Sequence, residues 1–220
     1  MIGYIALSPC WRNTVNGIFI SMEGPDGSGK STQIELLKKY FEDKGIECVI
    51  TREPGGTRIS EAVRGIILNK DYTEMDYMTE LLLYASARAQ LVSEVILPAL
   101  EEGKCVISDR FVDSSAVYQG IARGLGVETV YEINKYATRN RFPDKTFLLD
   151  LPAEVGIARK KDQKDLDRME LEKLSFHEKV AQGYREMADR DSERIVRIDA
   201  TKSVEEIHEI IISEVSRYVS

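Results

Sequence analysis

Hydrophobic residues gather in five short runs along the chain, and each run is bounded by polar or glycine-rich sequence. Such runs are typical of buried β-strands. They cover residues 18–22, 48–50, 104–109, 145–150 and 194–199. Amphipathic segments alternate with them, which predicts an α/β fold with a doubly wound, five-stranded parallel sheet flanked by helices. In such sheets ligands bind beyond the carboxyl ends of the strands.

Apolar residues at helical spacing predict the connecting helices. The clearest segments are residues 33–44, about 75–100, about 152–161, about 170–188 and from 203 towards 218. Pro98 and Gly103 are expected to end the longest of them. Ser203 is the expected N-cap of the last helix, and Glu206 would complete a capping box. The middle of the 75–100 segment is apolar nearly all round, which fits either a subunit interface or a large monomer core.

The overall composition narrows the class of protein. The chain has 220 residues, of which 43% are hydrophobic, and this suffices for one sizeable α/β domain. A net charge of −7 argues against a general nucleic-acid or membrane-surface binder. No apolar run approaches the roughly 20 residues of a membrane span, and the three cysteines lack metal-ligand spacing. We expect a cytoplasmic protein with an N-terminal extension at 1–16 and one domain at 17–220.

A glycine-rich loop joins the first predicted strand to the first predicted helix. It consists of Gly24, Pro25, Asp26, Gly27, Ser28, Gly29, Lys30, Ser31 and Thr32. Strand, loop and helix are the context in which the pattern G-x-x-x-x-G-K-[ST] binds phosphate. Glycines let successive N–H groups face one anion, and the helix N-terminus adds its positive dipole end. A glycine-rich turn without a nucleotide role is the alternative, but the complete motif indicates a P-loop for a nucleotide triphosphate.

Two side chains of this region suit magnesium. Lys30 would add a positive charge at the phosphates, and the Ser31 hydroxyl would be a ligand for Mg²⁺. Asp109 ends the third predicted strand, where a carboxylate is unfavourable to bury without a partner. A magnesium ion held through water between Asp109 and Ser31 would be that partner. The alternatives are an ion pair with Arg110 or a cap on the following helix.

The class of nucleotide enzyme follows from what the rest of the chain contains. The run Asn-Lys-Tyr-Ala at 134–137 has alanine where a GTPase would need aspartate to read guanine, and it lies in a predicted helix. ABC-type and motor ATPases are normally longer and carry elements that couple them to partners. A small kinase therefore remains the leading class.

Five motifs occur in one order along the chain. They are Gly-Pro-Asp-Gly-Ser-Gly-Lys-Ser-Thr, Thr-Arg-Glu-Pro-Gly-Gly-Thr, Leu-Leu-Leu-Tyr-Ala-Ser-Ala-Arg, Asp-Arg-Phe-Val-Asp-Ser-Ser-Ala-Val-Tyr-Gln-Gly and Leu-Asp-Arg-Met-Glu. This ordered set closely resembles bacterial thymidylate kinases from about residue 17 to the C-terminus. The resemblance implies transfer of the γ-phosphoryl group of ATP to dTMP, with Mg²⁺, in a homodimer formed through the long helix around 75–100. It also implies a mobile lid at about 159–169.

Two other functions remain open beside this one. The chain could be another nucleoside monophosphate or deoxynucleoside kinase of the same fold. It could also be a nucleotide-binding regulatory module without turnover. A panel of acceptor nucleotides would separate the three.

The resemblance implies roles for residues that would hold the acceptor phosphate. Asp26 corresponds to the family's carboxylate near the acceptor's 3′-hydroxyl and phosphate, although an aspartate that stabilises the turn is a common alternative. Arg52 and Arg110 correspond to arginines that hold the phosphate, a task that suits the planar fork of guanidinium. Either arginine could instead form a structural ion pair.

The resemblance also implies a base pocket. Tyr84 stands where the family usually has a phenylalanine that stacks on thymine, and Arg88, four residues later on the same helix face, would donate to O4. A core tyrosine and a surface arginine are the alternative for this pair taken alone. Ser115, Tyr118 and Gln119 fall where the family reads the thymine edge and excludes ribose. Ser115 replaces the asparagine of some relatives.

The charged segment after the fourth strand resembles the lid that closes over ATP. Gly27 stands where other members place an arginine, and in members with glycine the lid arginines supply the catalytic charge. Arg159 and Arg168 match such arginines, whereas Lys161 replaces another. The candidates for the catalytic cation are therefore Arg159 first, then Lys161 or Lys164. A solvated charge run is the alternative for any single lysine.

Overall fold

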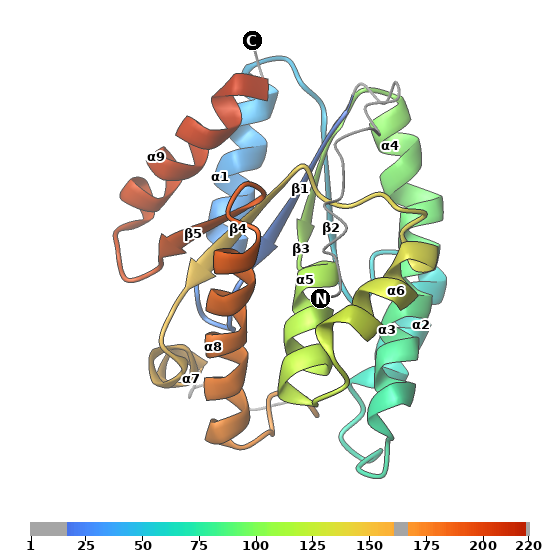
Figure 1. The fold of residues 1–220 in the computed structure, drawn as a ribbon. Helices are drawn as coiled ribbons and strands as arrows, with labels where there is room; N and C mark the ends of the chain where they lie inside the picture. The colour runs from blue at the N-terminus through green and yellow to red at the C-terminus, as the bar shows by residue number, and fades with distance from the viewer. Residues whose placement is uncertain (1–16, 161–166, 219–220) are drawn as a thin grey trace, which may run out of the picture.

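All five predicted strands are present and form one parallel sheet in the computed structural model, which describes residues 17–160 and 167–218 (Figure 1). The strands are β1 (Ile18–Glu23), β2 (Cys48–Arg52), β3 (Cys105–Asp109), β4 (Lys145–Asp150) and β5 (Ile195–Asp199). Their order across the sheet is β2-β3-β1-β4-β5. Asp109 lies opposite both Met22 and Arg52, so the carboxyl ends of three neighbouring strands meet at one edge. The predicted fold class is confirmed.

Helices connect the strands and cover both faces of the sheet (Figure 1). They are α1 (Lys30–Asp43), α2 (Arg58–Ile67), α3 (Tyr77–Leu91), α4 (Leu97–Glu101), α5 (Val112–Ser115), α6 (Val127–Ala137), α7 (Ala153–Lys160), α8 (Leu174–Arg190) and α9 (Val204–Val215), with π-helical turns η1 (Val92–Ile96) and η2 (Ala116–Ala122) and a final 3₁₀ turn η3 (Ser216–Tyr218). Within the described ranges, no helix combines the length and apolar character that crossing a bilayer requires. The predicted N-terminal extension, residues 1–16, lies outside these ranges.

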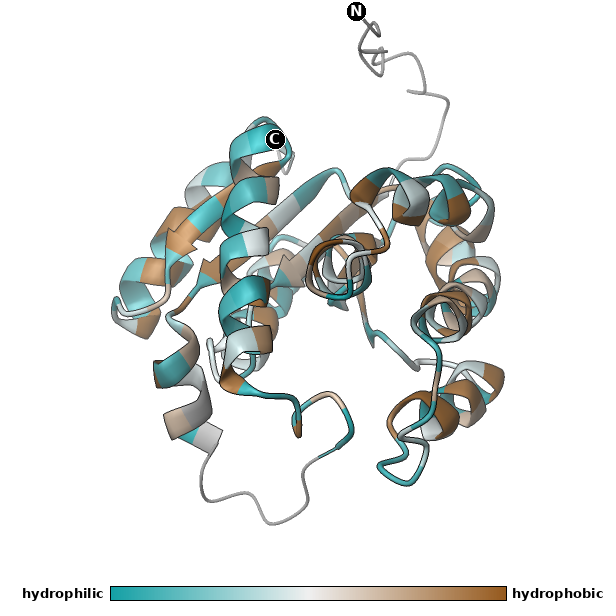
Figure 2. Ribbon diagram, turned by 60° about the horizontal axis from the view of Figure 1, so that its bottom comes forward, coloured by the Kyte–Doolittle hydropathy of each residue, from teal (hydrophilic) through white to brown (hydrophobic). Residues whose placement is uncertain are grey.

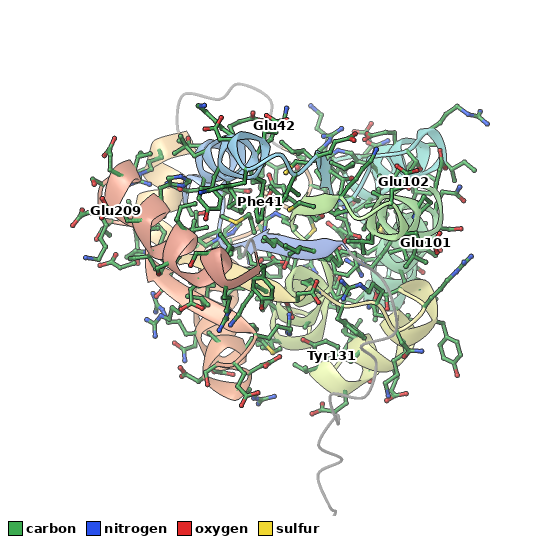
Figure 3. The ribbon with its side chains drawn as sticks, turned by 90° about the horizontal axis from the view of Figure 1, so that it is seen from above. Phe41, Glu42, Glu101, Glu102, Tyr131 and Glu209 are labelled. Carbon is green, nitrogen blue, oxygen red and sulfur yellow. The ribbon has the colours of Figure 1, made fainter. Side chains whose placement is uncertain are left out.

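Successive residues of β1 point into two different apolar layers, as the period of a strand requires. Ile20 and Met22 pack with side chains of α1 and α9, whereas Phe19 packs with the segment formed by α3, η1 and α4. Figure 3 shows the same division on α1, where Phe41 points toward the sheet and Glu42 points away. Hydrophobic and hydrophilic residues accordingly alternate along the helices in Figure 2. Packing on both faces holds the strand ends in place.

The long helical segment continues past Pro98, where the sequence predicts that it ends. Helix α3, the turn η1 and helix α4 follow one another without a break, and Pro98 lies in the first turn of α4. The prediction that Pro98 ends this helix is wrong. A proline lacks an N–H donor and crowds the carbonyl four residues earlier, and the wider π-helical turn directly before it relieves that crowding. Gly103, with φ of 79°, follows the end of the segment as predicted.

The last helix begins as its sequence predicts. The Ser203 hydroxyl accepts a hydrogen bond from the Glu206 N–H at 3.2 Å, and the Glu206 carboxylate accepts one from the Ser203 N–H at 2.9 Å. These two bonds satisfy two of the N–H groups that lack partners at a helix start. The predicted capping box of α9 is therefore confirmed.

Candidate active site

The P-loop leaves the end of β1 and leads into α1. Gly24, Gly27 and Gly29 all have positive φ, and a Cβ atom on Gly24 would lie 2.5 Å from the Leu149 carbonyl oxygen. Glycine is therefore required for the path of this loop. Among the residues that the structure describes, no side chain caps the first turn of α1, so its first N–H groups can bind an anion.

Lys30 is the first residue of α1, and its side chain is buried beneath the loop. Its Nζ donates to the carbonyl oxygens of Gly24 and Pro25, both at 3.1 Å. Burial, followed by the charge of Arg110, lowers the pKa of Lys30 from 10.5 to about 8. The two carbonyl groups therefore compensate the buried charge of Lys30 only in part. An anion bound beside Nζ would raise the pKa of Lys30 again.

The arrangement of Asp109 fits a hydrated divalent cation. Its Oδ1 is buried and has no hydrogen-bond partner among the described residues. Asp109 and Ser31 line the same cavity, while the Arg110 guanidinium is turned to Asp26. The part of the chain that the structure describes contains no cluster of three acidic, histidine or cysteine ligands. A single carboxylate with a hydroxyl suits Mg²⁺, which retains several waters and binds substrate phosphates rather than a complete protein cage.

A cavity of about 530 Å³ opens beyond the carboxyl ends of β1, β2 and β3. This volume is within the range of small-molecule sites. Most of the residues predicted to bind nucleotides line it. They are Asp26, Gly27, Gly29, Lys30, Ser31, Thr32, Arg52, Tyr84, Arg88, Asp109, Arg110, Ser115, Tyr118 and Gln119. Of the other predicted residues, Gly24, Pro25 and Ser28 belong to the same P-loop, and Arg159 contacts it from α7.

Both arginines predicted to hold the acceptor phosphate are at the cavity wall, and both make ion pairs. Arg110 Nη2 donates to Asp26 Oδ1 at 2.7 Å. Arg52 Nη2 donates to Glu61 Oε1 at 2.8 Å. Arg110 also has φ of 69°, a left-handed conformation that is uncommon outside glycine. The first ion pair joins Arg110 to the P-loop, and the second joins Arg52 to α2.

Arg88 is almost completely buried, with 1% of its surface exposed, although it lines the cavity. Its Nε donates to both carboxylate oxygens of Glu53, at 3.0 and 2.8 Å. The Nη1 group donates to Asn134 Oδ1 at 2.6 Å, and Nη2 donates to Ser115 Oγ at 3.1 Å. Burial raises the pKa of Glu53, and the charge of Arg88 opposes this rise. Glu53 and Asn134 are positioning partners that the sequence analysis did not identify.

The remaining predicted base-pocket residues are aromatic or polar and lie on facing helical segments. Burial raises the pKa of Tyr84, and it raises that of Tyr118 to about 12, so both phenols are neutral. The Arg110 guanidinium lies 5.5 Å from the centre of the Tyr118 ring. Gln119 Nε2 donates to Glu80 Oε1 at 2.9 Å, which fixes its amide at the wall.

The two arginines that match lid arginines make different contacts. Arg159 Nη1 donates to the Gly27 carbonyl oxygen at 2.8 Å, so this cation lies at the P-loop. Arg168 instead donates to the Ile67 carbonyl oxygen at 2.8 Å and pairs with Glu80 at 2.7 Å. Arg168, near the end of the predicted lid segment, is therefore anchored to α2 and α3. Lys161 and Lys164 lie outside the described residues.

One buried carboxylate beside the P-loop was missed by the sequence analysis. Glu23 ends β1 and has no exposed surface. Burial, followed by the charge of Asp113, raises its pKa from 4.5 to about 7. The sequence contains one signal that could have identified Glu23: like Asp109, it is a carboxylate at the end of an apolar strand.

Comparison with known proteins agrees with this geometry. The family model described as thymidylate kinase matches residues 22–211. The thymidylate kinase of Geobacillus thermodenitrificans (strain NG80-2) is 50% identical over 195 residues, which cover 88% of this chain and 87% of that protein. That of Geobacillus sp. (strain WCH70) is 48% identical, over 91% of this chain and 97% of that protein. The crystal structure of thymidylate kinase from Ehrlichia chaffeensis superposes with a TM-score of 0.72 at 30% identity, covering 90% of this chain and 98% of that chain. The chain therefore belongs to the thymidylate kinase family.

Proposed function

We propose that this phosphotransferase moves the γ-phosphoryl group of ATP to dTMP, giving dTDP and ADP, as a step of dTTP synthesis in the cytoplasm. The observation that carries the proposal is that Lys30 of the P-loop, Arg88 and Arg110 all line the same cavity. A donor-phosphate site and an acceptor site that share one wall can align the two reactants for in-line transfer. Such alignment and charge neutralisation supply most of the catalysis in phosphoryl transfer.

On the donor side, the P-loop residues 24–32 hold the ATP phosphates, and Lys30 bridges them. Ser31 and Asp109 hold Mg²⁺, which neutralises the phosphate oxygens when it is bound. The buried Asp109 Oδ1 without a hydrogen-bond partner supports this metal site. Arg159 is the first candidate for the cation that stabilises the transferring group, because its guanidinium already contacts Gly27.

On the acceptor side, Arg52 and Arg110 hold the dTMP phosphate, and Asp26 contacts the phosphate and the 3′-hydroxyl. Tyr84 stacks on thymine, and Arg88 donates to O4. Ser115, Tyr118 and Gln119 line the thymine edge and the 2′ position of the sugar. Arg88 is fixed by Glu53 and Asn134, and Gln119 is fixed by Glu80, so these two polar groups are in place before the acceptor enters.

The outer surface of α2 and α3 supports a homodimer. Ile59 and Ile66 on α2 are 48% and 44% exposed, and Leu82 on α3 is 47% exposed, whereas Leu81 and Ala85 of α3 are buried. The long helical segment is thus buried on one side and presents apolar residues to solvent on another. Exposed apolar patches of this kind mark protein interfaces, and the second copy of this chain is the partner that we propose.

An acceptor panel tests the function. With ATP and Mg²⁺, dTMP should have the highest kcat/KM and dUMP a lower one, because dUMP lacks only the methyl group. The values for dCMP, AMP and thymidine should be at least about 100-fold lower, since each leaves buried polar groups of the pocket unpaired. ADP formation by a coupled assay is the measurement. A preference for AMP or thymidine would identify another kinase, and ATP binding without ADP release would identify a regulatory module.

Replacing Asp109 with asparagine tests the metal site. The side chain keeps its shape but loses the charge, so the Mg²⁺ concentration at half-maximal rate should rise about 10- to 100-fold. The KM for dTMP at saturating Mg²⁺ should change little. Asp144→Asn, at the amino end of β4, is the matched control and should leave the Mg²⁺ dependence as in the wild type. An unchanged Mg²⁺ titration of Asp109→Asn would remove this residue from the metal site.

A further inference from the structure

Glu23 is a buried carboxylate directly behind the wall of the cavity, which it does not itself line. Its Oε1 accepts a hydrogen bond from the Phe111 N–H at 2.7 Å. Its Oε2 lies 2.5 Å from the Ser114 hydroxyl and 3.1 Å from the Tyr184 hydroxyl, both of which donate to it. All three partners adjoin Arg110. Phe111 follows it in the chain, and the Ser114 and Tyr184 hydroxyls contact its guanidinium.

The Arg110 guanidinium depends on the same two hydroxyl groups. Its Nη1 lies 3.3 Å from Ser114 Oγ and 3.1 Å from the Tyr184 oxygen. Guanidinium can only donate, so both oxygens must accept from it, and each hydroxyl hydrogen must point elsewhere. Ser114 Oγ and the Tyr184 oxygen lie 2.8 Å apart, so one hydroxyl can donate to the other, but the second hydrogen still needs an acceptor. An ionised carboxylate can only accept, and Glu23 Oε2 is the acceptor within reach of both hydroxyls. The charge of Glu23 therefore favours the arrangement in which both oxygens accept from Arg110.

Glu23 also holds the backbone of Arg110. The Arg110 N–H donates to the Met22 carbonyl oxygen at 2.9 Å, and the next N–H, that of Phe111, donates to Glu23. These bonds, on either side of the residue, maintain its φ of 69°. A conformation of this kind persists only where the surroundings impose it.

We propose that Glu23 is a positioning residue for phosphoryl transfer, which acts through Ser114, Tyr184 and the Phe111 N–H to fix Arg110 at the acceptor phosphate. The inference rests on the proposed role of Arg110 in holding that phosphate. Glu23 touches neither substrate. Its contribution is to the affinity for dTMP, because Arg110 must otherwise be ordered when the acceptor binds.

The protonation of Glu23 should change this arrangement. The charged and titratable groups around it are Lys30, Arg110, Asp113, Tyr118 and Tyr184. Its pKa is about 7, raised mainly by burial and then by Asp113, while Ser114, Arg110 and the Phe111 N–H oppose the rise. Because Oε1 faces an N–H group, the proton must sit on Oε2, where it competes with the two hydroxyls. Below pH 7 the support of Arg110 should therefore weaken.

Glu23→Gln is the test. Glutamine can keep an acceptor toward Phe111, but it places an NH₂ donor against the two hydroxyls. The KM for dTMP at pH 8 should rise roughly tenfold, the effect of one hydrogen bond to a charged group, and the KM for ATP should stay near the wild-type value. In the wild type the KM for dTMP should rise as pH falls through 7. The Glu23→Gln variant should lack this rise in KM near pH 7. It should retain only the rise caused by titration of the dTMP phosphate, near pH 6.

The thermal stability of Glu23→Gln distinguishes a positioning role of Glu23 from a structural one. Folding raises the pKa of Glu23 from 4.5 to about 7. The folded state therefore binds the proton more tightly, and the free energy of unfolding falls as pH rises through this range. Removing the charge should thus leave the melting temperature at pH 8 equal to or above that of the wild type. A lower melting temperature, with the KM for ATP and dTMP raised together, would overturn the proposal.

Arg110→Ala distinguishes failure of this inference from failure of the proposed function. If Arg110→Ala raises the KM for dTMP but Glu23→Gln changes neither that KM nor its pH profile, only the positioning role of Glu23 is wrong. If Arg110→Ala leaves the KM for dTMP unchanged, the proposed phosphate contact of Arg110 is wrong, and the inference fails with it. An increase in both variants, with the pH step lost in Glu23→Gln, supports both.

Discussion

Replacing Lys30 with methionine is expected to reduce kcat by about 10³-fold, or about 4 kcal/mol of transition-state stabilisation, while the protein stays folded. Its Nζ lies in a buried site among loop carbonyls, where a charge acts more strongly than in water. Methionine fills a similar volume but carries no charge to neutralise the β- and γ-phosphates. ADP formation from ATP and dTMP at saturating concentrations is the measurement.

The same variant should not lose stability at pH 7. Burial lowers the pKa of Lys30 from 10.5 to about 8, so the unfolded state binds this proton more tightly. The free energy of unfolding of the wild type should consequently rise between about pH 8 and pH 10.5 as the lysine loses its charge. Below pH 8 the buried charge destabilises the fold, and methionine removes it. Chemical denaturation at pH 7 and pH 9.5 measures both effects.

Lys39→Met is the matched control for this experiment. Lys39 lies on the exposed side of the same helix, and its Nζ pairs with Asp43 at 2.9 Å. Its replacement should leave kcat and both KM values unchanged. Transfer by Lys30→Met within about tenfold of the wild-type rate would remove Lys30 from its assigned role.

The P-loop was predictable because its information is local. Nine consecutive residues specify the turn, the helix start and the charge, and the apolar run before them predicts the strand. Asp109 was proposed as a metal ligand on an equally local signal, a carboxylate that ends an apolar strand. The sheet followed from the alternation of apolar runs and helical segments, because each strand of a parallel sheet needs a crossover connection.

The partners of the site residues were not predictable, because they are distant in the chain. Arg88 pairs with Glu53, 35 positions away, and with Asn134, 46 positions away. Helical spacing places Arg88 on a face but does not say whether that face is buried. The opposite error was made for Pro98, where a local rule failed because the preceding π-helical turn accommodates the ring.

Arg88→Met is expected to lower the free energy of unfolding by about 3–5 kcal/mol, the usual effect of removing one partner of a buried ion pair. The loss arises because Glu53 remains, with its side chain only 4% exposed and without its counter-charge. Burial already raises the pKa of Glu53 against the effect of Arg88, and in the variant this pKa should rise further. The destabilisation should therefore be smaller at pH 5.5, where Glu53 can take up a proton, than at pH 8. Urea denaturation at the two pH values is the measurement, and Arg190→Met, at the exposed end of α8, is the control that should remain near wild type.

Adding Glu53→Gln to Arg88→Met separates the two roles of this arginine. The second substitution removes the unpaired charge, so much of the lost stability should return, because a buried pair replaced as a whole is often nearly neutral. The KM for dTMP should nevertheless stay raised by at least about tenfold, since the donor proposed to face O4 of thymine is still absent. Recovery of stability together with a wild-type KM would show that Arg88 serves the fold alone. A raised KM for dTMP in a stable double variant, with the KM for ATP unchanged, would assign Arg88 to base recognition, because only the acceptor then depends on it.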